Sequence, residues 1–361
     1  MNQQLVSFAA RLREWMGHAG AGPDGIRQFP ELALELFALQ FASNPAYRRI
    51  CEARQSTPQT VEHWTQIPAV PAGAFKELEL SSIPSPERTA VFHSSGTTDQ
   101  KPSRHFHCAE SLALYETSLW EWFQRHFEPG RQFLFLTPDP KAAPHSSLAH
   151  MMATVQRKAG GKFLGTLGAD GGWTMDFEAV VEELKCVCRQ GRPATVLGTA
   201  FSYVHLVDWL AQKELQCELP RGSQIMETGG YKSRSRVLPK SELHALITRY
   251  LGPVGDDIIC EYGMSELSSQ AYDNGSQPPP SAPPPRIFRF PPWARAQIIS
   301  PETGREVSDG GTGLIRIFDL ANTFSVAAIQ TDDLGIRRGD GFEWLGRAQL
   351  AETRGCSLTS V

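Results

Sequence analysis

Hydrophobic residues near the start of the chain recur at the spacing of amphipathic helices. Residues three or four positions apart lie on one face of an α-helix, so an apolar stripe with this spacing marks the face that packs on a core. Two such sets are Leu5, Phe8, Leu12 and Trp15, then Leu32, Leu36, Leu39 and Phe41. The pattern predicts that the chain opens with helices packed on a core.

From residue 89 the pattern changes to short apolar runs that alternate with helical stretches. The runs cover residues 90–92, 133–137, 194–198 and 257–260. Buried strands of a parallel sheet form such runs, because both of their faces are covered by the helices that connect them. We therefore predict βα units and a mostly parallel sheet.

Prolines concentrate at residues 274–292, whose sequence is NGSQPPPSAPPPRIFRFPP. Proline can neither continue a helix nor donate a hydrogen bond within a central sheet, so we predict a linker or surface loop here. Beyond it, short strand-like runs separated by glycine and aspartate turns favour a small β-rich subdomain. These runs cover residues 296–300, 313–318, 327–330 and 342–345.

The predicted organisation is therefore an α/β protein in four parts. They are N-terminal helices with an α/β core at 1–273, the proline-rich linker at 274–292, the β-rich subdomain at 293–347, and a C-terminal tail at 348–361.

Composition narrows the class of protein. The chain has 361 residues, of which 41% are hydrophobic, enough for a sizeable core. Lysine and arginine total 35 against 39 acidic residues, so the chain lacks the basic excess of a nucleic-acid-binding protein. The sequence shows neither a run of about 18 apolar residues nor a secretory signal pattern, which predicts a cytoplasmic protein without a membrane span. Its seven scattered cysteines are predicted to be reduced thiols.

The segment HSSGTTDQK at 93–101 directly follows the apolar run at 90–92. Small hydroxyl residues around a glycine let the backbone approach phosphate oxygens, and their N–H and O–H groups can donate hydrogen bonds. The spacing is not that of a Walker A loop, which argues against a P-loop NTPase. An ordinary turn is the alternative interpretation.

The segment EYGMSE at 261–266 directly follows the run at 257–260. The Tyr262 ring could stack on a purine, and the Glu266 carboxylate could hold Mg²⁺ against phosphate oxygens. The alternative is a turn into a helix whose N-terminus Glu266 would favour.

A third segment, TDDLG at 331–335, is followed by Gly346 and Arg347. A carboxylate here could accept hydrogen bonds from both ribose hydroxyls, and the arginine could donate to ribose or phosphate. Asp-Gly turns in surface hairpins give the same pattern.

The order and spacing of these three segments resemble the acyl-adenylate-forming superfamily, which includes the acyl-CoA synthetases. Its members carry (S/T)SGTTG, YGxTE and (T)GD segments followed by GR. Within it, the chain is similar to the acyl-protein synthetase (LuxE) family from about residue 41 onward. The segments that carry this narrower resemblance are IPAVP at 67–71, HSSL at 145–148, TGGYK at 228–232 and RGCSL at 354–358.

The resemblance implies the large-domain fold of adenylate-forming enzymes with a small β-rich subdomain and without the mobile C-terminal domain. It also implies ATP and Mg²⁺ as cofactors, with Glu266 as the metal ligand. The implied nucleotide-binding residues are Ser94, Ser95, Gly96, Thr97, Thr98, Gly229, Gly230, Tyr262, Gly263, Asp333 and Arg347. The implied catalytic residues are Thr97, Thr98, Glu266 and Cys356, the last as the thiol that accepts the acyl group.

The chain departs from the superfamily pattern at several positions. Asp99 replaces a glycine, Lys101 precedes Pro102 rather than following it, and Asp332 replaces the glycine before the ribose aspartate. The mobile domain of acyl-CoA synthetases carries a lysine that contacts the substrate carboxylate and α-phosphate. Because the resemblance implies that this chain lacks the mobile domain, another cation must neutralise the charge of the substrate carboxylate and the α-phosphate. The candidates are Lys232, Arg234 and Arg236. Alternating cations are more usually a solvated surface, and we favour that interpretation for at least two of the three.

The expected function is activation of a carboxylic acid with ATP, followed by acyl transfer to Cys356 or to a partner such as an acyl reductase or carrier protein. The resemblance favours a fatty acid. Two alternatives stay open: a ligase that uses coenzyme A or a carrier-protein phosphopantetheine, and a nucleotide-binding subunit that has lost catalysis.

One further cluster, His105 and His107, has the spacing that places both rings on one face of a strand. Because no carboxylate lies close by in sequence to complete a ligand set, we do not predict a metal site there.

Overall fold

The computed structural model describes residues 2–18, 23–94, 101–168, 172–229, 238–274 and 285–348. Among these residues no helix is both long enough and apolar enough to cross a bilayer. The described cysteines are all free thiols, as predicted from their spacing.

The α-helices are α1 (Gln3–His18), α2 (Pro23–Ser43), α3 (Pro45–Ala53), α4 (Ala74–Glu77), α5 (Ala109–Phe123), α6 (Ser147–Ala159), α7 (Phe177–Gln190), α8 (Ala200–Gln212) and α9 (Lys240–Leu251). The strands are β1 (Val70–Pro71), β2 (Ala90–His93), β3 (Arg104–His107), β4 (Gln132–Pro138), β5 (Lys162–Leu167), β6 (Trp173–Met175), β7 (Ala194–Thr199), β8 (Gln224–Thr228), β9 (Ile258–Tyr262), β10 (Ala271–Asn274), β11 (Ile287–Arg289), β12 (Ala294–Ile299), β13 (Thr312–Asp319), β14 (Ala328–Arg338) and β15 (Gly341–Arg347).

Polar residues stand where several of these helices begin. Asn44, Ser146, Asp176 and Thr199 each accept a hydrogen bond from a backbone N–H of the first turn, at α3, α6, α7 and α8. Such caps satisfy N–H groups that have no partner within the helix. Local sequence therefore sets where these helices start.

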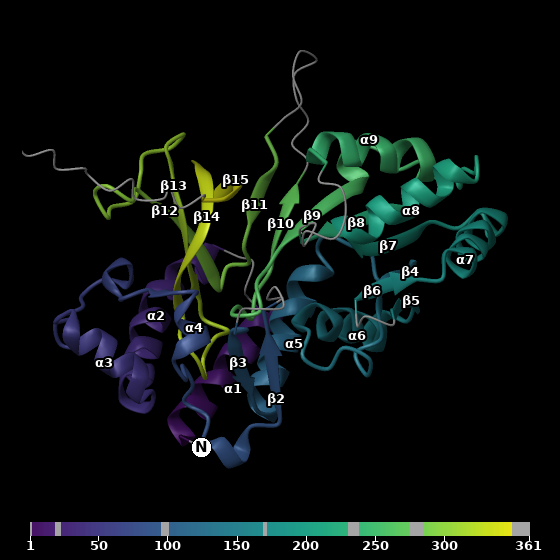
Figure 1. Cartoon of the computed structure of the whole chain (residues 1–361). Coiled ribbons are helices and arrows are strands. Elements are labelled where there is room, and N and C mark those ends of the chain that lie inside the picture. The colour runs from purple at the N-terminus through teal and green to yellow at the C-terminus, as the bar shows by residue number, and fades with distance from the viewer. Residues whose placement is uncertain are drawn as a thin grey trace, which may run out of the picture.

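Within the described residues, one sheet contains thirteen strands, in the order β12-β13-β14-β15-β11-β10-β9-β8-β7-β4-β5-β6, with β1 alongside β14. Strands β5, β4, β7, β8 and β9 are parallel, and the strands from β9 to β12 in this order pair antiparallel. Figure 1 shows the parallel strands beside α6 to α9, with α1 to α3 near the antiparallel strands.

Side chains of the parallel strands alternate between two cores. Leu134, Val196, Ile225 and Ile258 pack with α7, α8 and α9 on one face. Their neighbours Phe133, Leu197, Met226 and Ile259 pack with α5 and α6 on the other. This alternation follows from the period of two in a β-strand, and it fixes the face on which each later residue of β8 and β9 lies.

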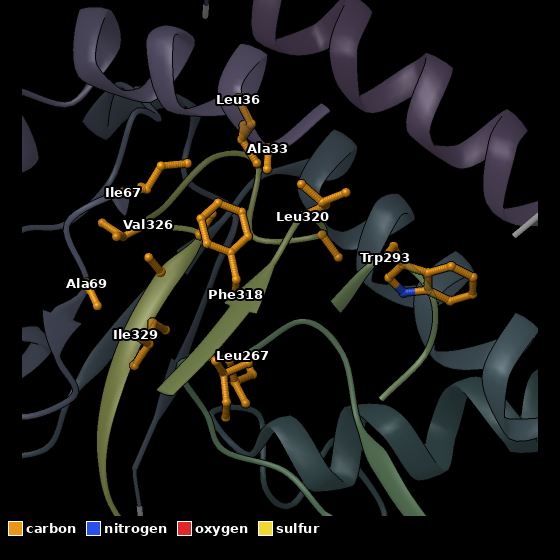
Figure 2. Close-up of a cluster of buried hydrophobic side chains, with 14 of the residues drawn as sticks. Ala33, Leu36, Ile67, Ala69, Leu267, Trp293, Phe318, Leu320, Val326 and Ile329 are labelled. Carbon is orange, nitrogen blue, oxygen red and sulfur yellow. The ribbon is translucent and has the colours of Figure 1, made fainter. Parts of the chain in front are cut away.

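A third core joins the N-terminal helices to the antiparallel strands. Figure 2 shows Leu36 of α2 near Phe318 of β13, with Ile329 of β14 and Trp293 in the same cluster. Leu5, Phe8 and Leu12 of α1 are also fully buried here. The helical stripes predicted from sequence are therefore confirmed as core-facing surfaces.

Most of the predicted strands are present, but their pairing differs from the prediction in two places. The run at 90–92 forms β2, which pairs with β3 in a separate two-stranded sheet rather than in the parallel sheet. Strand β11 lies inside the segment 274–292 that was predicted to be a linker, and it pairs with β10 and β15. The predicted β-rich region 293–347 thus continues the main sheet, and the division of the chain into separate units stays a prediction.

Asp319 at the end of β13 joins this region to the chain after β9. Its side chain is fully buried. Its Oδ2 accepts from the N–H groups of Ser268 and Ser269 at 2.9 and 2.8 Å, and its Oδ1 accepts from Ser269 Oγ at 2.7 Å and Ala321 N at 3.0 Å. Four donors converge on one carboxylate, so this group holds the segment that follows the EYGMSE motif.

We expect Asp319→Asn to lower the free energy of unfolding by about 2–4 kcal/mol, because one carboxylate oxygen becomes an NH₂ group that faces buried donors. Urea denaturation measures the loss. Asp340→Asn is the matched control, since Asp340 is 82% exposed and its ion pair with Arg289 is worth about 0–1 kcal/mol. Equal stability of the two variants would contradict this role for Asp319.

Candidate functional site

The predicted nucleotide-binding segments converge on one region of the fold. Ser94 follows β2, Gly229 follows β8, and Tyr262 ends β9, so two of these positions stand at the carboxyl ends of adjacent parallel strands. Ligands of α/β sheets bind at such carboxyl ends. The hairpin of β14 and β15 brings Asp333 to the same place through a hydrogen bond to Tyr262.

A chain of hydrogen bonds connects the start of the SSGTT segment to Glu266. The N–H of Ser94 donates to Ser103 Oγ at 3.2 Å, the hydroxyls of Ser103 and Ser265 lie 3.4 Å apart, and Ser265 Oγ donates to Glu266 Oε2 at 3.1 Å. Because Ser265 donates to the carboxylate, Ser103 donates to Ser265. The side chains of Ser103, Ser265 and Glu266 thus have a defined orientation.

Ser94 is held so that its hydroxyl can serve a ligand. Its Oγ accepts from the N–H of Ser103 at 3.0 Å, so the O–H hydrogen stays available for a further acceptor such as a phosphate oxygen. The first residue of the predicted phosphate loop is therefore anchored on both its main chain and its side chain.

Glu266 is fixed from two sides. It is 6% exposed, and its main-chain carbonyl accepts from Asn322 Nδ2 at 2.8 Å. Ser265 occupies one carboxylate oxygen. A carboxylate held in this way and linked to Ser94, the first residue of the predicted phosphate loop, suits the oxygen-ligand chemistry of Mg²⁺, so the residues present fit the predicted metal role.

His105 supports the same segment from β3. It is 3% exposed, and its Nδ1 donates to the carbonyl of Ser265 at 3.0 Å. Burial lowers the pKa of the ring to about 4, so the imidazole is neutral near pH 7. The His107 ring lies 4.3 Å from it on the same face of the strand, as the spacing predicts.

Tyr262 and Asp333 form the second pair of the site. The Tyr262 hydroxyl donates to Asp333 Oδ2 at 2.8 Å. Burial, with the nearby Asp333 charge, raises the pKa of Tyr262 well above its ordinary value, so the phenol keeps its proton. Burial raises the pKa of Asp333 too, while the hydrogen bond and the charge of Arg347 act in the opposite direction. Asp333 pairs directly with Arg347 across β14 and β15.

The Tyr262 ring is 8% exposed and packs edge-on against Phe288, Phe290 and Phe342, at centroid distances of 6.1, 6.3 and 5.3 Å. Its position is therefore set by an aromatic cluster as well as by Asp333. Only a small part of the ring is open to a ligand, and contact with adenine stays a prediction.

Two glycines of the site have physical reasons for being glycine. A Cβ on Gly263 would lie 2.3 Å from Glu261 Oε1, and Gly229 has a φ of +68°. Thr228 donates to the Glu261 carboxylate, and burial raises the pKa of Glu261 to about 7. The ends of β8 and β9 are thus joined directly below the candidate nucleotide site.

Several predicted residues lie outside the described ones: Ser95, Gly96, Thr97, Thr98, Gly230, Cys356 and the candidate cations Lys232, Arg234 and Arg236. Of the residues that depart from the superfamily pattern, Lys101 forms a surface ion pair with Glu77 at 3.2 Å. The backbone carbonyl of Asp332 accepts from Ala348 N at 2.8 Å.

The sequence analysis missed Ser103, Ser265 as a link, and Asn322. Ser103 and Ser265 are 162 positions apart, and single serines carry no spacing signal. Only the adjacency of each to a motif, Ser103 to the phosphate loop and Ser265 to Glu266, could have drawn attention to them.

Solved structures with the same arrangement are adenylate-forming enzymes. The 2-hydroxyisobutyryl-CoA ligase, solved in an open conformation with 2-HIB-AMP and CoA, is 14% identical and matches with a TM-score of 0.63 over 88% of this chain and 69% of its own. McyG A-PCP, complexed with phenylalanyl-adenylate, is 14% identical with a TM-score of 0.51 over 84% and 47%. The fold class is therefore that of adenylate-forming enzymes, as predicted.

The family model described as "Acyl-protein synthetase, LuxE" matches residues 27–360. Two relatives are named long-chain-fatty-acid--luciferin-component ligase. The one from Aliivibrio fischeri is 24% identical over 91% of this chain and 86% of its own, and the one from Vibrio harveyi is 22% identical over 90% and 84%. The chain belongs to the LuxE family of acyl-protein synthetases. The resemblance read from the sequence and the predicted enzyme class, a ligase, are confirmed.

We expect protonation of His105 to lower the free energy of unfolding as the pH falls. Its pKa is about 4 in the fold against an ordinary value of 6.5, so the unfolded chain takes up a proton first. The stabilisation from a neutral ring is present above pH 6.5 and falls by about 3 kcal/mol as the pH drops toward 4. His105→Asn keeps an N–H donor for the Ser265 carbonyl without titrating.

Unfolding free energies measured from pH 7 to pH 4 therefore decline less steeply in His105→Asn than in the wild type. The exposed His63 provides the control, because His63→Asn makes the same replacement at the surface and outside this hydrogen-bond network. An identical slope in His105→Asn and wild type would rule out this contribution.

Proposed function

We propose that this protein uses ATP to activate a carboxylic acid as an acyl-adenylate and then passes the acyl group to a thiol. The observation that carries the proposal is the hydrogen-bond chain from Ser94 through Ser103 and Ser265 to Glu266. It sets the start of a phosphate loop and a candidate Mg²⁺ ligand at a fixed separation. Reaction at a phosphate depends mainly on such positioning and on charge neutralisation.

In the first half-reaction a carboxylate oxygen of the acid attacks the α-phosphorus of ATP. The bond from that phosphorus to the α,β-bridging oxygen breaks, and pyrophosphate leaves with its electron pair. Mg²⁺ would neutralise phosphate charge, with Glu266 as its ligand. The Ser94 hydroxyl donates to a phosphate oxygen, together with the following residues Ser95, Gly96, Thr97 and Thr98. Asp333 accepts from the ribose hydroxyls, and Arg347 lies beside it on the paired strand.

In the second half-reaction a thiolate attacks the acyl carbon of the mixed anhydride, a thioester forms and AMP leaves. We propose Cys356 as this thiol, with transfer onward to a partner protein such as an acyl reductase or carrier protein. The names of the two relatives support a long-chain fatty acid as the substrate. A cytoplasmic location, as the sequence predicts, suits this chemistry.

The test is acid-dependent exchange of labelled pyrophosphate into ATP across a panel of fatty and aromatic acids, with covalent labelling by the same acids. Wild type, Cys356→Ala and the control Cys186→Ala are compared, because Cys186 lies on α7 away from the site. We expect exchange in all three proteins and a hydroxylamine-sensitive acyl label in wild type and Cys186→Ala only.

Other outcomes select the alternatives. Exchange with an undiminished label in Cys356→Ala moves the acceptor to another thiol, and thioester formation only with coenzyme A or a carrier protein indicates that class of ligase. ATP binding without exchange under any acid identifies a nucleotide-binding subunit and overturns the proposal.

We expect Tyr262→Phe to weaken ATP binding by at least about tenfold, because the Asp333 carboxylate loses the donor that orients it and a hydrogen bond to a charged group is worth about 1.5–3 kcal/mol. Calorimetric titration with ATP measures the change. Tyr250→Phe on α9 removes a hydroxyl elsewhere and should leave affinity unchanged. Unaltered binding by Tyr262→Phe would show that Asp333 does not need this contact.

A further inference from the structure

A cluster of metal-ligand side chains lies on the opposite face of β8 and β9 from Thr228 and Glu261. Glu227 and Cys260 are directly paired across these strands, and His244 reaches them from α9. Glu227 shares a face with Ile225, and Cys260 with Ile258, on the side covered by α7 to α9. These residues take no part in the proposed adenylation.

The three ligand atoms are spaced as the corners of one coordination sphere. Cys260 Sγ lies 3.1 Å from Glu227 Oε2 and 3.7 Å from His244 Nε2, and His244 Nε2 lies 3.5 Å from the same Glu227 oxygen. In a tetrahedral zinc site, with Zn–S of about 2.3 Å and Zn–N and Zn–O of about 2.0 Å, the S–O and S–N separations are about 3.5 Å and the N–O separation about 3.3 Å. The observed separations differ from these by about 0.4 Å or less.

The second oxygen of Glu227 points to a ligand independently. Glu227 is fully buried, and within the described part of the chain its Oε1 has no hydrogen-bond partner. A buried carboxylate oxygen without a partner is costly, and an ion or its bound water would satisfy it. The side chain of His244 is 12% exposed, so an ion can reach the cluster from solvent.

Neighbouring side chains orient the candidate ligand Cys260. Asp273 Oδ1 accepts from the backbone N–H of Cys260 at 2.6 Å, and its Oδ2 accepts from Arg286 at 2.6 Å. Arg286 Nη1 also lies 3.7 Å from Cys260 Sγ, where its charge favours a thiolate. Partners of this kind orient metal ligands in an outer shell.

Lys240 currently neutralises Glu227. Its Nζ lies 2.9 Å from Glu227 Oε2, and its side chain is 30% exposed, so it can turn toward water. The Cys260 thiol donates to the same oxygen and therefore carries its proton. A divalent ion would replace one ammonium charge and one thiol proton, which leaves the net charge around Glu227 unchanged.

We propose that Glu227, His244 and Cys260 form a binding site for a thiolate-preferring divalent ion of the Zn²⁺ class, separate from the Mg²⁺ that accompanies ATP. Thiolate and imidazole ligands select Zn²⁺ or Co²⁺ over Mg²⁺. On binding, the Cys260 S–H proton leaves to solvent, His244 binds the ion through Nε2 and keeps a proton on Nδ1, and Lys240 moves off Glu227. One proton is released per ion.

The test titrates Co²⁺ into the metal-free full-length protein. We expect one ion per chain, with a thiolate-to-cobalt charge-transfer band and the visible bands of tetrahedral Co²⁺, displaced by Zn²⁺ and untouched by excess Mg²⁺. Cys260→Ser loses the charge-transfer band, and His244→Ala weakens binding by at least about tenfold, since even outer-shell partners are worth that much. Cys186→Ser, on α7, leaves the charge-transfer band and the Co²⁺ affinity unchanged.

Lys240→Met should change the Co²⁺ affinity in the opposite direction. It removes the competing ammonium, so Co²⁺ affinity rises at least about tenfold, and added Zn²⁺ raises the melting temperature of this variant more than that of wild type. Calorimetry in buffers of different ionisation enthalpy should give about one proton released per ion. Absence of the band in wild type, its persistence in Cys260→Ser, or weaker binding by Lys240→Met would overturn the proposal.

Discussion

The buried carboxylate of Asp319 is the contact on which the arrangement of the candidate site depends most. It ends β13 and accepts hydrogen bonds from Ser268, Ser269 and Ala321, so the antiparallel part of the sheet holds the chain just after the EYGMSE motif. A charge in the interior is tolerated only where enough donors surround it. Because Ser268 and Ser269 are remote in sequence from Asp319, these hydrogen bonds give their segment one position. Ser265 and Glu266 directly precede this segment, so their position depends on the same contact.

From this fixed segment the site extends in two directions. Ser265 reaches back through Ser103 to Ser94, which ties the two-stranded sheet of β2 and β3 to the main sheet. Tyr262 reaches across to Asp333 on β14. The predicted phosphate and ribose contacts thus come from parts of the chain that share no local structure, and the proposed adenylation needs both at once. Hydrogen bonds among buried or half-buried groups supply the common frame.

The two faces of strands β8 and β9 carry different polar clusters. Thr228 and Glu261 are hydrogen-bonded next to the candidate nucleotide-binding residues, while the adjacent positions Glu227 and Cys260 face α9 with His244. Successive residues of a strand point to opposite sides, so two polar clusters can lie one residue apart along the chain without touching. Their separation allows the proposed ion-binding cluster and the proposed adenylation site to share the same pair of strands.

The sequence by itself determined the amphipathic helices and most strands, because each depends on periodicity. It also singled out Ser94, Tyr262, Glu266 and Asp333 as candidate site residues, because each lies in a short contiguous pattern. It misjudged β2, whose apolar run is the same whether it joins the parallel sheet or pairs with β3. Only the tertiary structure decided that Ser103 meets Ser265 and that Glu227, His244 and Cys260 converge. Those contacts depend on strand register and on the packing of α9, which are set by the summed burial of many side chains and leave no spacing signal in the residues that meet.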